Sequence, residues 1–410
     1  MKFAHLSDCH IGSWKDPKLR NTSTIAFLRA MDSCIEKKVD FILISGDLFD
    51  TSLPAMDLLK EVVTKFKELK DKGIPVYVIA GSHDYSPSGK TMIDVIENAG
   101  LFTNVCKGTV IDNKLHLKFT VEQKTGAKIT GILGKRGQLE KLYYEHLDKE
   151  DLEQESGFKI FMFHSGISEF KPEDLAEMDA SPLSLLPRGF DYYAGGHIHD
   201  VFQKHEKEYG LIAFPGPLFP NNFKELEKLE RGGFYMYEDG KLTWEPIQVH
   251  AVYKIALDCT NMAPQDVERK IQEQIAKKEF VNTIVTIRLY GQLLSGKPSD
   301  INYKDLFEEL YHKSAYFIMK NTAKLTSPEF DAVAVEVKSA KEIEDASITE
   351  HLGQIKLDGL DVASEKKLVK GLMETLSQER REGERTVDFE KRIKEEVEKV
   401  FEELGIENFK

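Results

Sequence analysis

The chain has 410 residues, of which 41% are apolar and 30% charged, and its net charge is -13; because it is too long for one compact core, we expect an ordinary globular protein of two or three domains. The acidic balance argues against binding of nucleic acid over the whole surface, since such affinity comes largely from Lys and Arg at phosphates, but it leaves room for a local basic groove. No apolar stretch approaches the ~20 residues of a membrane span, and the first residues lack a basic-then-apolar leader, so we expect a cytoplasmic protein.

The first 249 residues predict an α/β domain. Short runs rich in Val, Ile and Phe, such as "VDFILIS" and "PVYVIAG", alternate with segments of helical apolar spacing, which is typical of a βαβα start and a largely parallel sheet. Further strand-like runs follow, and the last pair predicts a hairpin that turns at Asp239 and Gly240. We therefore expect a core of two sheets packed as a β-sandwich and flanked by helices.

Residues 250–327 predict a small α+β module, because three strand-like runs alternate there with two amphipathic segments. The charged and weakly periodic residues 328–361 predict a linker. Residues 362–410 then predict a helical region, and this completes the expected domain order.

The helical region shows two apolar stripes, from Leu368 to Leu376 and from Ile393 to Leu404. Two short helices cannot bury such stripes against each other alone, so we expect them to dock on a partner. The alternative is that they pack on this chain's own core.

Five short motifs at or just beyond strand ends carry candidate chemistry. They are "DCH" (Asp8, His10), "GDLFD" (Asp47, Asp50), "GSHD" (Ser82, His83, Asp84), "FHSG" (His164) and "GHIH" (His197, His199). In an α/β sheet, ligands gather at the carboxyl ends of strands, so residues far apart in sequence can converge there. The i, i+2 spacing of Asp8/His10 and of His197/His199 predicts that each pair lies on one face of an extended segment.

These residue types predict a two-metal site. Imidazole and carboxylate together suit Mn, Fe or Zn, and a carboxylate can bridge two ions because it has two oxygens. Two ions ~3.5–4 Å apart form a clamp for in-line displacement at phosphorus. A single strand-end histidine is commonly a packed core residue, but five motifs in this order favour the catalytic interpretation.

The order DxH, GDxxD, GxHD, H and GHxH resembles the calcineurin-like metallophosphoesterase superfamily over about the first 250 residues. One branch of this superfamily is the most similar. The similarity lies in the stretch "VDFILISGDLFD", the "FPGP" at 214 to 217, the small module and the helical tail. That branch is the archaeal double-strand-break repair nucleases of the meiotic-recombination nuclease family, whose bacterial relative is SbcD. The resemblance implies a Mn-dependent DNA nuclease with 3′–5′ exonuclease and single-strand endonuclease activity.

The resemblance also implies a role for each motif residue. It assigns the first metal to Asp8, His10, Asp47 and His199, and the second to Asp47, Ser82, His164 and His197, with Asp47 bridging. His83 is implied as the catalytic histidine, which contacts the scissile phosphate and protonates or steadies the leaving oxygen. We expect Asp84 to orient its neighbours, and Asp50 to contact an adjacent group or substrate, or to cap the next helix.

Two residues depart from the family pattern. The superfamily usually has Asn where this chain has Ser82, and a hydroxyl is a shorter and weaker ligand than a carboxamide oxygen. The repair branch often has a histidine where this chain has Asp50. We therefore predict that the second metal site has the lower affinity.

Contacts to a phosphodiester need cations near the site. The candidates are Lys15, Lys18 and Arg20 after "DCHIG", Lys90 beyond "GSHDYSPSG", and Lys135 and Arg136 in "GILGKRGQ"; each alone can also be ordinary surface charge. Trp14 is a candidate for stacking on a base, with core packing as the alternative.

The resemblance further implies three interactions. The small module caps the active site and helps to hold DNA, and the C-terminal helices bind the coiled-coil base of an SMC-like ABC ATPase. The apolar faces at 58–69 and 92–96 supply a homodimer interface, unless they simply cover the sheet.

Together these observations predict a Mn-dependent DNA exonuclease and endonuclease that works with an ATPase in double-strand-break repair. The first alternative is a metallophosphoesterase for small molecules or phosphoproteins. The second is a DNA-end-binding scaffold with weakened catalysis.

Overall fold

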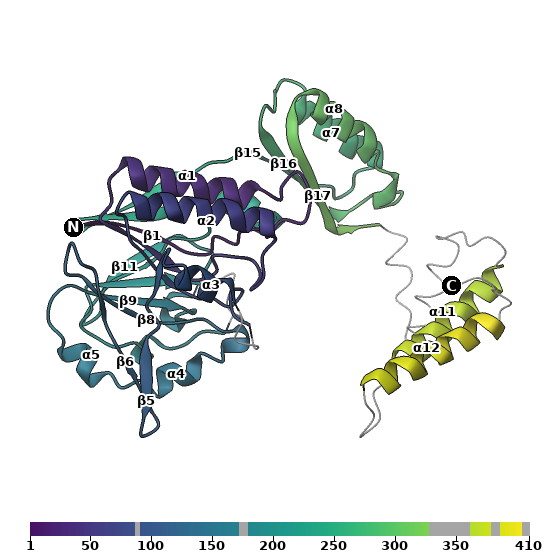
Figure 1. The fold of residues 1–410 in the computed structure, drawn as a ribbon. Coiled ribbons are helices and arrows are strands. Elements are labelled where there is room, and N and C mark those ends of the chain that lie inside the picture. The colour runs from purple at the N-terminus through teal and green to yellow at the C-terminus, as the bar shows by residue number, and fades with distance from the viewer. Residues whose placement is uncertain (87–90, 172–178, 328–360, 379–385, 404–410) are drawn as a thin grey trace. The chain divides into compact units, whose positions relative to one another are not determined.

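The computed structural model describes residues 1–86, 91–171, 179–327, 361–378 and 386–403 (Figure 1). The chain forms two compact units, Met1–Pro328 and Glu329–Lys410. Within the described residues, no helix is both long enough and apolar enough to cross a membrane.

Two six-stranded sheets form the centre of the first unit. The first has the order β14 (Lys241–Ile247), β13 (Gly232–Glu238), β1 (Lys2–Leu6), β2 (Phe41–Ser45), β3 (Val76–Ile79) and β4 (Thr103–Asn104). The second has the order β11 (Phe202–Glu206), β12 (Gly210–Phe214), β10 (Tyr192–Gly196), β9 (Lys159–His164), β8 (Lys128–Ile132) and β7 (Thr120–Val121). Strands β1 to β4 are parallel to one another, as are β8, β9, β10 and β12. The predicted sandwich and the hairpin at Asp239 and Gly240 are confirmed.

An aromatic layer fills the space between the sheets. The ring of Phe3 stacks on Phe41 and on Tyr237, with centroids 4.9 Å and 4.6 Å away. The first sheet thus buries alternate residues of its strands in this layer and turns the intervening ones outward, as the period of two requires. His5 is fully buried here and its Nδ1 lies 2.9 Å from the Tyr192 hydroxyl, so it has a structural role in this layer.

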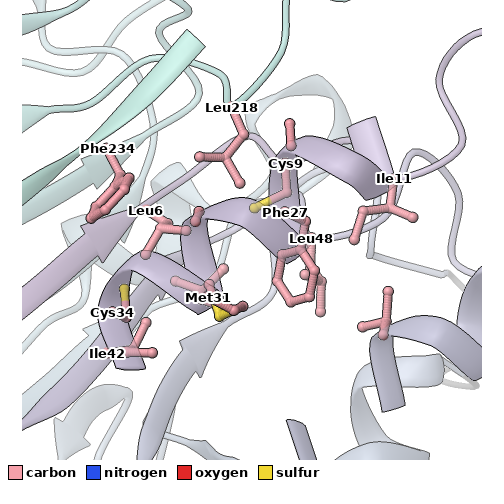
Figure 2. Packing of buried hydrophobic residues seen from close by; sticks show 14 of the residues in the cluster. Leu6, Cys9, Ile11, Phe27, Met31, Cys34, Ile42, Leu48, Leu218 and Phe234 are labelled. Carbon is pink, nitrogen blue, oxygen red and sulfur yellow. The ribbon is translucent and has the colours of Figure 1, made fainter. Parts of the chain in front are cut away.

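Three helices cover the outer face of the first sheet: α1 (Thr22–Glu36), α2 (Met56–Asp71) and α3 (Met92–Asn98). In Figure 2, Phe27 and Met31 of α1 pack against Leu6 and Ile42 of the sheet. The apolar residues of α2 are buried in the same way, with Leu58 2% exposed and Phe66 fully buried.

The alternative that the faces at 58–69 and 92–96 cover the chain's own sheet therefore describes their buried residues. Val95, within 92–96, is 56% exposed, and Leu53 at 66% and Met56 at 72% are exposed beside the faces, so the homodimer interface stays a prediction.

Short elements surround the second sheet. They are the hairpin of β5 (Gly108–Ile111) and β6 (Lys114–Leu117), the helices α4 (Lys141–Glu145), α5 (Glu150–Gln154) and α6 (Phe223–Leu229), and the 3-10 turns η1 (Arg136–Gln138), η2 (Ser168–Phe170) and η4 (Leu183–Leu185). The segment with η1 and α4 follows β8 directly and so begins at the same edge of the sheet as the motifs.

A three-stranded parallel sheet of β15 (Ala251–Asp258), β16 (Thr283–Gln292) and β17 (Ala315–Thr326) follows, with α7 (Pro264–Ile275), η5 (Pro298–Asp300) and α8 (Tyr303–His312). Its own apolar core joins both helices to the sheet. Arg288 of β16 donates to Glu227 of α6 at 2.8 Å, and the Tyr316 hydroxyl donates to the Lys18 carbonyl at 2.5 Å. These contacts attach the small sheet to the segments that follow β1 and β12.

The second unit contains α11 (Val362–Leu376) and α12 (Thr386–Glu403), which lie against each other (Figure 1). They approach closely at Gly371, where a Cβ would lie 2.8 Å from Val400 Cγ1. Leu368 is buried, whereas Leu376 stays 64% exposed. The two predicted helices are therefore present, and they leave part of their apolar stripes uncovered; Leu404 lies outside the described residues.

Candidate metal centre

The candidate ligands come from the carboxyl ends of five parallel strands. Asp8 and His10 follow β1, Asp47 and Asp50 follow β2, Ser82 and His83 follow β3, His164 ends β9, and His197 and His199 follow β10. Strand pairing puts β1, β2 and β3 side by side in one sheet and β9 beside β10 in the other. The two sheets meet at these ends, so the motifs converge as predicted.

Glycines allow the sheets to approach closely here. A Cβ on Gly196 would lie 2.0 Å from the Ser45 carbonyl oxygen, and one on Gly46 would lie 2.2 Å from His164 Nδ1. Both distances are far below van der Waals contact, so only glycine fits at either position without movement of the motif loops.

Four of the candidate ligands have left-handed backbones, with φ of 50° at Asp8, 41° at His10, 52° at Asp47 and 85° at His197. The extended segments expected for the two i, i+2 pairs are therefore wrong, because the chain turns sharply after each strand. Left-handed conformations cost non-glycine residues energy and cluster at functional sites. The loops thus hold the side chains in place at the expense of local stability.

The first cluster consists of Asp8, His10 and His199, whose ligand atoms all lie within 4.8 Å of one another. The Nε2 atoms of the two histidines face each other at 3.1 Å. Asp8 Oδ1 lies 3.6 Å from His199 Nε2. Two imidazoles and one carboxylate therefore converge on one small space.

Asp47 lies between this first cluster and a second cluster, which consists of Ser82, His164 and His197. Its Oδ2 lies 3.6 Å from His10 Nε2 and 3.1 Å from His164 Nε2. Its Oδ1 accepts the backbone N–H of His83 at 2.8 Å, which fixes the carboxylate. One oxygen of Asp47 thus stands between the two groups of histidines, as a bridging carboxylate would.

The second cluster lies in a pocket of about 550 Å³ that is lined by Ser82, His83, Lys135, Arg136, Gly137, Glu140, His164, Asp179 and His197. The rings of His164 and His197 meet edge to face at 5.2 Å. Ser82 therefore lies beside the residues with which the family pattern groups it.

The Nδ1 atoms of three histidines are hydrogen-bonded to protein oxygen atoms. Nδ1 lies 2.8 Å from the Ser45 carbonyl in His164, 2.9 Å from the Asp50 carbonyl in His83, and 2.9 Å from the Glu225 carboxylate in His199. These partners accept hydrogen bonds only, so Nδ1 carries a proton in each ring and Nε2 is the nitrogen left for other contacts.

The residues fit divalent metal ions. His164 Nε2 is fully buried and has no hydrogen-bond partner among the described residues, although it points at Asp47. The Nε2 atoms of His10 and His199 face each other at 3.1 Å, beside the carboxylates of Asp8 and Asp47, so a cation among them would meet nitrogen and oxygen donors together. Nitrogen and carboxylate oxygen together are the donor set of borderline divalent ions.

The carboxylates of Asp8 and Asp47 are ionised, whereas the imidazole of His197 is neutral. Burial by itself would raise the pKa of Asp47, but the facing His164 outweighs it and the pKa lies well below its ordinary value. Burial opposes ionisation of Asp8 too, yet its hydrogen bond with His199 brings the pKa down to about 2. Burial lowers the pKa of His197 to about 4, so this imidazole is neutral at pH 7 and free to act as a ligand.

The two other acids of the motifs orient their neighbours. Asp84 is buried and accepts backbone N–H groups of Leu48 at 3.1 Å and Phe49 at 2.9 Å, so the expected orienting role is confirmed. Asp50 Oδ1 lies 3.4 Å from His10 Nδ1 and 3.6 Å from His83 Nδ1. Asp50 thus contacts adjacent histidines, and the alternative of a helix cap is wrong because α2 begins at Met56 with Ala55 as its cap.

Among the predicted phosphate contacts, Lys135 and Arg136 lie at the pocket. Lys135 Nζ donates to the Tyr143 hydroxyl at 2.6 Å, and Arg136 Nε donates to the Ser82 carbonyl at 3.4 Å. Lys15, Lys18 and Arg20 do not line the pocket; Arg20 pairs with Asp57 at 2.8 Å and Lys18 lies over the Tyr311 ring. Lys90 lies outside the described residues.

Trp14 packs against the core and donates its Nε1 hydrogen to the Pro220 carbonyl at 3.0 Å. The core alternative therefore describes Trp14 in this structure, and base stacking stays a prediction.

Two glutamates at the site lie outside the five motifs, so the sequence does not predict them. Glu225 holds His199, and Glu140 is buried at the pocket, where it accepts the backbone N–H of Lys135 at 3.0 Å. Asn222-x-x-Glu225 is a helix-start pattern that predicts α6. Nothing in the sequence indicates that the same carboxylate reaches a histidine 26 residues earlier.

The comparisons with known proteins agree with this geometry. Residues 1–201 match the calcineurin-like phosphoesterase family. DNA double-strand break repair protein Mre11 of Methanococcus maripaludis is 26% identical over 324 residues, which cover 76% of this chain and 79% of the relative. The protein of that name from Thermoplasma acidophilum is 30% identical over 301 residues, 70% of this chain and 77% of the relative.

An uncharacterized metallophosphoesterase of Bacillus subtilis, YhaO, is 30% identical over 277 residues, 63% of this chain and 64% of the relative. The sandwich, the strand-end ligands and the family match define a calcineurin-like metallophosphoesterase. Within that class, the chain belongs to the family of the Mre11 proteins.

Proposed function

We propose that the chain is a Mn²⁺-dependent DNA nuclease that processes broken ends in double-strand-break repair. The observation that carries the proposal is the place of Asp47 Oδ2, at 3.6 Å from His10 Nε2 and 3.1 Å from His164 Nε2. A carboxylate between two sets of imidazoles is suited to two bridged cations. The names of the Mre11 relatives support DNA repair as the setting.

The proposed ligands follow the two clusters. Asp8, His10, Asp47 and His199 hold one ion, and Asp47, Ser82, His164 and His197 hold the other. When bound, such a pair of ions acts as a Lewis acid on a phosphodiester and supplies the nucleophile for its hydrolysis. The hydroxyl of Ser82 is the weakest donor of the set, so the second site has the lower affinity.

His83 is the proposed catalytic residue. Its side chain is 41% exposed in the pocket, while the backbone N–H is held by Asp47 and Nδ1 by the Asp50 carbonyl. The contact of Nδ1 fixes the ring and leaves Nε2 as the nitrogen available to substrate. A histidine in this place protonates the leaving oxygen of the cleaved strand.

Lys135 and Arg136 are the proposed phosphate contacts. Both line the same pocket as His83, and Arg136 is the more exposed of the two. The hydroxyl and ring of Tyr143 hold the Lys135 ammonium beside the pocket. Charge-assisted contacts of this kind bind a phosphate without reading the base.

The remaining interactions are proposals from the family and the fold. We propose a nuclease domain at 1–249, a capping and DNA-binding domain at 250–327, a linker at 328–361, and a region at 362–410 that binds an SMC-like ABC ATPase. Exposed Met373 and Leu376 of α11 support the last assignment. Leu53, Met56 and Val95 form the exposed apolar surface proposed for a homodimer, and a cytoplasmic location stays a prediction.

One assay separates this function from the two alternatives. Purified protein with Mn²⁺ is incubated with end-labelled duplex DNA, with single-stranded DNA and with bis(p-nitrophenyl) phosphate, beside a His83→Ala variant. DNA cleavage that is lost in the variant supports the nuclease. Hydrolysis of the dye alone supports a small-molecule phosphoesterase, and end binding without cleavage supports a scaffold.

A further inference from the structure

A carboxylate outside the proposed ligand set holds one of its histidines. Glu225 Oε1 lies 2.9 Å from His199 Nδ1, on the side of the ring that faces away from the cluster. On the opposite side, His199 Nε2 lies 3.1 Å from His10 Nε2 and 3.6 Å from Asp8 Oδ1. The ring of His199 thus joins Glu225 to the proposed first metal site.

Glu225 is itself fixed by the start of α6. Its Oε2 accepts the backbone N–H of Asn221 at 2.8 Å, and its Oε1 accepts from the Asn222 side chain at 2.6 Å. The loop before α6 is pinned in turn, because Ser13 donates to the Asn221 side chain and Trp14 donates to Pro220. The carboxylate is therefore held by the fold rather than free to rotate on a surface.

The contact to His199 differs from its counterpart at the second site. A neutral backbone carbonyl, that of Ser45, holds His164 at 2.8 Å, whereas an anionic side chain holds His199. A carboxylate behind an imidazole fixes the ring and its tautomer, and it strengthens the ring as an electron donor to a cation. The two sites thus differ in the groups behind their histidines as well as in Ser82.

We propose that Glu225 is the positioning residue of the first metal site: it locks His199 with Nε2 toward the ion and makes this site the tighter of the two. The inference rests on the ligands proposed above and adds a residue that the motifs do not contain. It assigns the difference in affinity to two causes that can be separated, a strong donor at the first site and a weak one at the second.

The test is a Mn²⁺ titration of the full chain, followed by the electron paramagnetic resonance of the free ion. Wild type, Glu225→Ala, Glu225→Gln and the control Glu227→Ala are compared. The control removes the contact of α6 to Arg288 but leaves Glu225 and its contacts to Asn222 and His199. It therefore separates a disturbance of helix α6 from a role at the metal.

We expect Glu225→Ala to weaken the tight class of sites by about 10- to 100-fold, the usual effect of removing such a partner, and to leave the weak class unchanged. Glu225→Gln keeps an oxygen acceptor without the charge, so it falls between Ala and wild type. Glu227→Ala stays within about threefold of wild type, a change smaller than that range.

A second readout needs no metal. In nitrogen-15 spectra of the histidine rings, the metal-free wild type shows His199 Nδ1 as an N–H in a hydrogen bond with a carboxylate, and Glu225→Ala loses that hydrogen bond. Tight binding in Glu225→Ala with an unchanged His199 ring signal overturns the inference, and so does an equal loss of affinity in Glu227→Ala. A wild type that binds no Mn²⁺ overturns the proposed metal centre itself.

Discussion

Gly196 provides a direct test of how closely the two sheets must approach at the metal centre. In Gly196→Ala, the new Cβ would lie 2.0 Å from the Ser45 carbonyl oxygen and 2.7 Å from His164 Nδ1. To reach the 3.4 Å of ordinary contact, the Ser45 carbonyl and the β10 backbone must separate by about 1.4 Å. Ser45 precedes Asp47 by two residues and Gly196 precedes His197, so this movement changes the distances among the ligands.

A misplacement of about 1 Å in a catalytic site can cost on the order of 100-fold in rate. We therefore expect Gly196→Ala to lower hydrolysis of bis(p-nitrophenyl) phosphate about 100-fold and to weaken Mn²⁺ binding. Gly233→Ala is the matched control, because its Cβ would lie 2.5 Å from the Glu245 carbonyl in β14, away from the motifs. If both variants fold and Gly196→Ala retains wild-type rate and affinity, the close approach of the sheets does not set the ligand geometry.

Further predictions concern the second site, the buried core and the tail. Ser82→Asn supplies the carboxamide oxygen of the family pattern, so we expect the weaker class of Mn²⁺ sites to tighten; two equally tight ions already present in the wild type would contradict this. Burial lowers the pKa of His5 to about 3, and the unfolded chain binds its proton near 6.5, so stability that is complete above pH 6.5 is lost as the pH falls toward 3. The loss from His5 between pH 6.5 and 4.5 is about 2–3 kcal/mol, and urea unfolding of His5→Gln should show a flatter pH dependence; equal slopes would refute the assignment. A chain that ends before Val362 should keep Mn²⁺-dependent DNA cleavage but lose binding to the ATPase partner in a pull-down, and retained binding would refute the role of the tail.

Much of the site follows from the sequence because its physical basis is local. Each motif directly follows an apolar run, and the carboxyl ends of neighbouring parallel strands share one edge, so the convergence of Asp8, Asp47 and His164 is predictable. The left-handed turns at Asp8 and His10 are not, because positive φ is uncommon in non-glycine residues, even though Asp and His adopt it more often than most. Glu225 reaches His199 through a tertiary contact that no spacing encodes.

The apolar stripe of α2 shows a second limit. Leu58, Val62 and Phe66 have the same spacing whether they cover their own sheet or a second copy of the chain, since a helix buries the same face in both cases. The structure puts them in the core, and the exposed residues beside them, Leu53 and Met56, belong to a loop and a helix end that carry no periodic signal.

Anomalous X-ray diffraction at the manganese edge, from crystals grown with Mn²⁺, tests the central claim most directly. We expect two peaks about 3.5–4 Å apart, one beside Asp8, His10 and His199, the other beside His164 and His197, with Asp47 between them. A single peak, or two peaks that Asp47 does not bridge, would contradict the two-metal centre.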